Sequence, residues 1–225
     1  MTINFPIIVV SSPKPKIGNS VLSLNLAGAL WNDNYTVGLF SSHQNQITSF
    51  LKSRAEFAKK NKTDLIIPKQ ISSLNGSSDI SALVADISAT DYNCHKDIFS
   101  IAHTLITPLN YKDDILWKSN DKYLNFIWEI KKVQASHGIK YLNWIIVPYL
   151  KNNDIDFSAE LEEQAKRFGF KVAPAIYYRD EYMHITDGYC AADLQNKKLE
   201  KMMSLNDLYA RREILQLAEF IWQKK

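Results

Sequence analysis

A chain of 225 residues is long enough for one α/β domain with a large core, so it needs no disulfide or metal to fold. Its 46% hydrophobic and 23% charged residues are typical of a soluble globular protein, and no apolar stretch of about 18 residues is present to span a bilayer. The net charge of +3 is too small for a dedicated nucleic-acid-binding domain, although it allows weak attraction to DNA.

The first ten residues lack the basic start and the small-residue cleavage site of a signal peptide, so we expect a cytoplasmic protein. Cys94 and Cys190 lie far apart in the sequence and show no CxxC or Cys/His spacing. Neither a disulfide framework nor a zinc site is therefore expected. Both cysteines are predicted to be buried free thiols.

Hydrophobic patterning predicts strands that alternate with helices along the chain. In chain order the expected elements are a strand at 5–10, a helix at 20–31, a strand at 36–40, a helix at 48–60, a short apolar run at 65–67, a strand at 82–87, a helix at 94–103, a strand at 104–109, a helix at 113–136, a strand at 141–147, a helix at 158–168, a strand at 170–173 and a helix at 205–222. This alternation predicts an α/β fold with a mainly parallel sheet and helices on both faces, in a single domain over residues 1–225.

One helical stripe mixes apolar residues with a charged one. Phe50, Leu51, Arg54 and Phe57 recur at helical spacing within residues 48–60 and are expected to pack on the sheet.

Residues 14–20, Lys-Pro-Lys-Ile-Gly-Asn-Ser, fall between the first predicted strand and the first predicted helix. In P-loop proteins this place holds phosphates in backbone N–H groups. A working loop needs glycines for close backbone approach, a lysine for the β and γ oxygens, and a Ser or Thr hydroxyl for magnesium. Gly18 and Ser20 meet these needs, but Asn19 stands at the lysine position, and Pro15 and Lys16 stand at glycine positions. Taken alone, the loop also fits an ordinary strand-to-helix turn.

The order and spacing of further segments resemble the ParA/MinD/MipZ family of P-loop positioning ATPases, and MipZ most closely. Lys14 matches the first lysine of the family's deviant P-loop, which reaches the phosphates held by the partner of a nucleotide-sandwiched dimer. Residues 83–86 are similar to the apolar run that ends in the Walker B aspartate. Other similar segments are 24–30, 35–40, 107–110, 143–147, 162–172 and 210–215.

The resemblance implies a nucleotide site whose residues come from the phosphate loop: Lys14, Lys16, Gly18, Asn19 and Ser20. Ser20 and Asp86 are the implied magnesium ligands, although a lone aspartate at a strand end is also a common turn residue. Lys16 is an alternative cation for the phosphates, but a solvated side chain is favoured. Arg179 falls in the late loop that packs over the nucleotide in the family, and a surface ion pair is an equal alternative.

Departures from the family fall where nucleotide chemistry occurs. Ser-Ser-His at residues 41–43 replaces the switch I aspartates, residues 87–90 lack the glycine that senses a γ-phosphate, and Pro148 and Tyr149 replace an adenine-contacting Arg-Asn pair. His43 is a candidate general base, with simple solvent exposure as the favoured alternative. The resemblance implies ATP and magnesium as ligands, and these losses weaken the expectation that they bind. No residue is predicted to be catalytic.

The favoured hypothesis is a weak or pseudo-ATPase that acts through protein partners of the division or chromosome-segregation machinery. It includes weak non-specific DNA binding, no membrane association, and a monomer or a nucleotide-dependent homodimer. The main alternative is an active ATPase that cycles between monomer and dimer. A metabolic P-loop enzyme related to dethiobiotin synthetase is a third hypothesis, and Asn19 argues against it.

Overall fold

The computed structural model describes residues 5–73, 79–110, 121–139, 142–151, 157–195 and 203–222. Its strands are β1 (Ile7–Ser11), β2 (Val37–Ser41), β3 (Lys69–Gln70), β4 (Ala82–Ile87), β5 (Thr104–Asn110), β6 (Asn143–Leu150), β7 (Lys171–Val172) and β8 (Ile176–Tyr177). They form one sheet in the order β3-β2-β4-β1-β5-β6-β7, with β8 also paired to β6, and every described pairing is parallel. The expected parallel α/β fold is confirmed.

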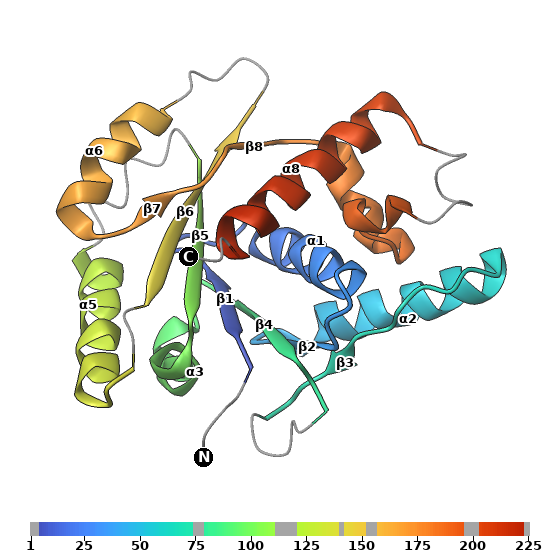
Figure 1. Cartoon of the computed structure of the whole chain (residues 1–225). Helices are drawn as coiled ribbons and strands as arrows, with labels where there is room; N and C mark the ends of the chain where they lie inside the picture. The colour runs from blue at the N-terminus through green and yellow to red at the C-terminus, as the bar shows by residue number, and fades with distance from the viewer. Residues whose placement is uncertain are drawn as a thin grey trace.

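The helices cover both faces of this sheet (Figure 1). They are α1 (Asn19–Asn32), α2 (Gln44–Asn61), α3 (Lys96–Ile101), α5 (Asp121–Ser136), α6 (Ser158–Phe168) and α8 (Leu205–Trp222), with 3-10 segments η1 (Tyr92–His95), η2 (Asp180–Asp187) and η3 (Ala191–Gln195). Because successive strand residues point to opposite faces, Ile8 and Val10 of β1 join the core under α1, α2 and α8. Ile7 and Val9 join the core under α3, α5 and α6.

The observed boundaries of β4, α6 and α8 equal the expected ones. Helix α2 starts at Gln44, one turn earlier than expected, and residues 92–101 divide into η1 and α3 instead of forming one helix. The strand near the apolar run at 65–67 is displaced to β3. Of the helix expected at 113–136, residues 113–120 lie outside the described residues.

The thiol prediction is right for one cysteine and wrong for the other. Cys190 is buried, but Cys94 is exposed because η1 places it at the surface. None of the helices in the described ranges is both long enough and apolar enough to cross a bilayer.

A buried ion pair fixes the late segment of the chain on α1 and α2. Arg54 of α2 donates from Nη1 and Nη2 to the carboxylate of Asp193 in η3, at 2.6 and 2.9 Å, and the two side chains are 0% and 1% exposed. Arg54 also donates from Nε to the carbonyl of Ile66 and from Nη1 to the carbonyl of Gly188. Trp31 of α1 donates to the same carboxylate and lies under the guanidinium, 4.4 Å from ring centroid to Cζ. The interaction joins three elements that are distant in sequence.

Candidate functional site

The first strand, the second strand and the fourth strand end together at one edge of the sheet. Val10 of β1 and Ser41 of β2 both pair with Asp86 of β4, so the loop after β1 begins beside the ends of two neighbouring strands. Ligands of open parallel sheets bind at this carboxyl edge. The position expected for the phosphate loop is therefore occupied by residues 12–18.

Two residues of the loop have left-handed backbone conformations. Gly18, with φ of 100°, is the N-cap of α1, and a Cβ added there would lie 3.2 Å from Cε2 of Tyr149. Glycine suits both the dihedral angle and the close approach. Lys16 has φ of 63°, at a cost of about 1–2 kcal/mol for a residue with a side chain. The substituted glycine position is thus accommodated with strain.

The N-terminus of α1 keeps the properties of an anion site. No side chain caps it by a hydrogen bond, and its first turn contains no acidic residue. The first N–H groups of a helix have no partner within the helix, and the helix dipole favours negative charge there. A cavity of about 370 Å³ opens in front of it, lined in part by Gly18, Asn19, Ser20, His43 and Asp86.

Ser20 and Asp86, the implied magnesium ligands, are in direct contact. Ser20 Oγ donates to Asp86 Oδ2 at 2.6 Å, and Ser41 Oγ donates to the same oxygen at 3.3 Å. Burial raises the pKa of Asp86, and the two hydroxyl hydrogen bonds partly oppose this. An all-oxygen donor set suits magnesium, which is commonly held by one or two carboxylates together with nucleotide phosphates. The residues fit a shared metal–phosphate site, and the described ranges contain no cluster of acidic, histidine or cysteine side chains that would hold a metal without a nucleotide.

Asn19 bridges the loop to the end of β4 in place of a lysine. Its Nδ2 donates to the carbonyl of Ile87 at 3.4 Å, while Oδ1 is buried and has no hydrogen-bond partner among the described residues. An unpaired buried acceptor costs about 1–3 kcal/mol. The side chain therefore supplies no positive charge to the phosphate cavity.

Two lysines of the loop lie near residue 19, and of these Lys16 lines the phosphate cavity. Lys14 is half-buried, and Lys16 is exposed at the boundary between the phosphate cavity and a second cavity. His43, the candidate base, is exposed in the phosphate cavity and lies 3.7 Å from the carboxylate of Asp91. Residues 41–43 are Ser-Ser-His, so they bring no carboxylate to the cavity.

The second cavity, of about 280 Å³, lies on the other side of the loop and is rich in tyrosine. Its walls include Gly18, Tyr149, Tyr178, Tyr182 and Arg179. The rings of Tyr149 and Tyr178 meet edge to face with centroids 5.6 Å apart. Arg179 pairs with Glu213 of α8 at 2.6 Å, and this hydrogen bond raises the pKa of Arg179. Arg179 thus both forms the ion pair of the alternative hypothesis and lines a cavity beside the loop.

Residues 71–221 match the family model described as ATPase MipZ. The chain belongs to the MipZ ATPase family. The match begins after the phosphate loop, so membership depends on β4 and the later elements rather than on residues 14–20. No curated protein sequence matches the chain.

Solved structures place this MipZ-family chain in the ParA/MinD type of P-loop fold. A plasmid partition protein of Borrelia burgdorferi bound to AMPPNP is 15% identical, with a TM-score of 0.63 and coverage of 98% of this chain and 100% of that one. The MinC:MinD cell division complex of Aquifex aeolicus gives 13% identity, a TM-score of 0.57 and coverage of 98% and 96%. Cobyrinic acid a,c-diamide synthase of Mycobacterium smegmatis, with an ATP analogue and magnesium, is 13% identical, with a TM-score of 0.60 and coverage of 98% of this chain and 97% of that one. At these identities the similarity shows the fold alone.

Sequence reasoning missed the composition of the second cavity in the MipZ-family chain. The expected strand at 141–147 continues to Leu150, so Tyr149 belongs to β6 and not to a loop. Tyr182, in the late loop that contains Arg179, is buried and donates to Glu213 at 2.7 Å. The tyrosine pair at 177–178, next to Arg179 in sequence, is the feature from which an aromatic cavity could have been predicted.

Proposed function

We propose that this MipZ-family protein positions division or chromosome-linked machinery by binding protein partners, with ATP hydrolysis impaired or lost. The single observation that carries the proposal is the state of Asn19. Its amide nitrogen donates to the carbonyl of Ile87, and its oxygen is buried with no hydrogen-bond partner among the described residues. A lysine at this position would supply the charge that the phosphates need.

Phosphoryl transfer depends on positioning and on neutralising the transferred group. Removing a cationic clamp costs several orders of magnitude in rate. In this chain, Ser20 and Asp86 would hold magnesium together with the phosphates, and magnesium would supply Lewis-acid charge when bound. Ser41 and Ser42, however, offer no carboxylate to orient the attacking water. The retained residues support weak nucleotide binding better than turnover.

The proposed partners are proteins of the division or segregation machinery. The MinD neighbour is described in complex with MinC, which supports a partner-binding use of this fold. Weak, non-specific DNA binding fits the net charge of +3. The expectation that residues 1–225 act as one domain is part of the same proposal.

Magnesium-dependent phosphate release by the purified protein tests this function. The wild type is expected to release phosphate no faster than Asp86→Ala and Ser20→Ala variants, because hydrolysis above that background needs both residues. Release that is faster than in both variants and that requires magnesium would contradict the proposal.

An active ATP-driven switch is the second candidate, and three features of the phosphate site favour it. The uncapped N-terminus of α1, the left-handed Gly18 and the Ser20–Asp86 contact are the features that nucleotide binding uses. Lys14 or Lys16 would then supply the missing charge. The same assay separates the two functions, because only the switch predicts release that is lost in Lys14→Ala or Lys16→Ala.

A further inference from the structure

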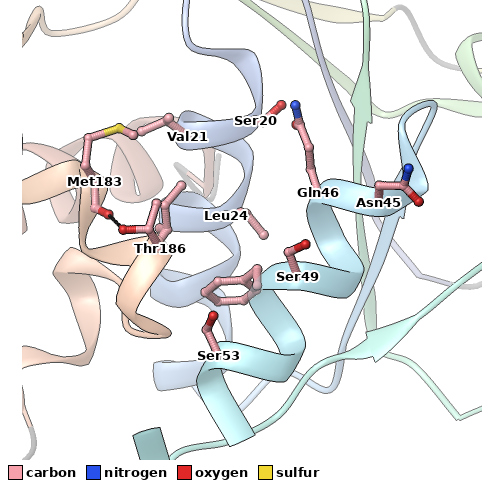
Figure 2. A pocket seen from close by; sticks show the side chains of 11 residues that line it. Ser20, Val21, Leu24, Asn45, Gln46, Ser49, Ser53, Met183 and Thr186 are labelled. Atoms are coloured by element: carbon pink, nitrogen blue, oxygen red, sulfur yellow. Dashed lines mark hydrogen bonds between the residues drawn. The ribbon is translucent and has the colours of Figure 1, made fainter. Parts of the chain in front are cut away.

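A third cavity, of about 470 Å³, lies between α1, α2 and η2 (Figure 2). We call it the uncharged cleft. Its apolar walls come from Val21 and Leu24 of α1, Phe50 of α2, and Met183 and Ile185 of η2. Figure 2 shows Val21 and Met183 approaching each other across one end, and Leu24 directed toward α2. The volume lies in the range of small-molecule sites, about 300–1,000 Å³.

We propose that the uncharged cleft binds a small neutral organic molecule with an apolar ring or branched body and one or two hydrogen-bonding groups. This site lies beside the phosphate cavity and goes beyond the proposed function. The apolar walls remove such a body from water, which is the main source of affinity for a ligand of this kind.

The polar groups of the cleft fix the class of ligand. They are hydroxyls and amides: Ser49 and Ser53 stand one turn apart on α2, and Thr186 of η2 donates its hydroxyl to the Met183 carbonyl at 2.9 Å. None of the described side chains lining the cleft is ionisable. A charged ligand would lose its hydration there without gaining a counter-ion, whereas a hydroxyl or amide would find partners. The lining therefore favours a neutral ligand.

A macromolecular occupant fits the cleft less well. Nucleic acid needs cations to neutralise phosphates, and the described lining offers none. Protein interfaces centre on contiguous exposed apolar surface, but of the large exposed apolar side chains in the described ranges only Met183 lines the cleft. The recess between two helices and η2 instead suits a small molecule that packs against its apolar walls.

The cleft meets the phosphate cavity at one end. Ser20, Val21 and Gln46 line both, and Figure 2 shows the Gln46 amide directed toward Ser20. A molecule in the cleft would therefore lie next to the hydroxyl that contacts Asp86. Ser49, in contrast, lines only the cleft among these cavities, so a variant there tests the cleft without altering the phosphate site.

The test uses 2-naphthol as a neutral probe and 2-naphthoate as its charged counterpart, titrated into the full chain without nucleotide and followed by calorimetry and by NMR. We expect saturable binding of 2-naphthol with shifts at cleft residues, and binding of 2-naphthoate at least about tenfold weaker. Ser49→Trp, which fills the cleft, should abolish binding of 2-naphthol. Ser136→Trp makes the same change at an exposed position of α5 and should leave it unchanged. Thr186→Trp, from the opposite wall, serves if Ser49→Trp does not fold.

Equal binding of the two probes, absence of 2-naphthol binding at millimolar concentration, or retained binding in the filled variants would overturn the proposal. Sedimentation of the same proteins tests whether a second copy of the chain occupies the cleft instead. A wild-type dimer that Ser49→Trp dissociates and Ser136→Trp does not would assign the cleft to a second copy of the chain, and it too would overturn the proposal. Because no nucleotide is present, these results are independent of ATP binding or hydrolysis.

Discussion

Helix α1 connects two polar regions that are built in opposite ways. Near its end, Trp31 joins the Arg54–Asp193 pair, in which each guanidinium nitrogen donates a hydrogen bond and both carboxylate oxygens accept. At its start, no described residue bonds the buried oxygen of Asn19 or caps the helix N-terminus with a side chain. Both regions are polar, but only the first satisfies its own hydrogen bonds.

The difference separates a structural role from a binding role. A fully bonded buried network has no capacity left for a ligand, and its purpose is to fix one arrangement of α1, α2 and η3. At the start of α1 the first N–H groups have no partner within the helix, and Asn19 Oδ1 has none among the described residues, so a partner from outside can complete this hydrogen bonding. The absence of a lysine at residue 19 then limits how tightly an anionic partner binds.

Breaking the Arg54–Asp193 pair should produce the largest change, a loss of folding stability. Asp193→Ala leaves the Arg54 guanidinium buried without its counter-ion, and we expect a loss of about 3–5 kcal/mol in the free energy of unfolding by urea denaturation. Glu129→Ala removes one partner of the exposed Lys96–Glu129 pair and should cost less than about 1 kcal/mol. Equal losses in the two variants would show that the Arg54–Asp193 pair has no special structural role.

Restoring charge to the second region should produce a gain of binding. Asn19→Lys places an ammonium at the family's phosphate-binding position, so ATP affinity in calorimetry with magnesium should rise at least about tenfold, or about 1.4 kcal/mol. Asn19→Met, of similar length but neutral, is the matched control and should show no gain. If Asn19→Lys binds ATP no better than Asn19→Met, the loop at Pro15 and Lys16 has closed the phosphate site.

The carboxyl group beside the loop should give a smaller effect that depends on pH. Burial raises the pKa of Asp86 above its ordinary value of 3.8. At pH values between 3.8 and the raised pKa, the folded state therefore binds more protons than the unfolded chain. Stability contributed by this group therefore falls as the pH rises from about 4 through the folded pKa. The stability of Asp86→Asn relative to the wild type should increase over that window and then level off, as measured by urea unfolding at several pH values. A difference that does not change with pH would contradict the raised pKa.

The fold was largely predictable because its determinants are local. The continuous apolar run of β4 and the helix stop at Gly169 after α6 fix those boundaries without reference to the rest of the chain. The start of α2 was missed because its first turn has few apolar residues and no side-chain cap at His43. Local patterns identify elements well where turn residues or caps mark their ends.

The site was predictable only in part because its partners are distant in sequence. Arg54 stood out only as a charge in an apolar stripe, and its partner Asp193 is 139 residues away. The contact between Ser20 and Asp86 was implied by a family resemblance, whereas the packing of Tyr149 against Gly18 depends on how β6 lies beside the loop. Such contacts depend on the order of the strands in the sheet, and local sequence patterns do not predict that order.

The central claim, that ATP no longer switches this chain, is tested most directly by sedimentation velocity at several protein concentrations with and without ATP and magnesium. Without a tightly held nucleotide, Lys14 and Lys16 of two copies would oppose each other across the family's dimer interface, and this repulsion disfavours closure. We expect the same association state under all these conditions. An ATP-induced dimer that disappears in Lys14→Ala would contradict it and show that the switch survives.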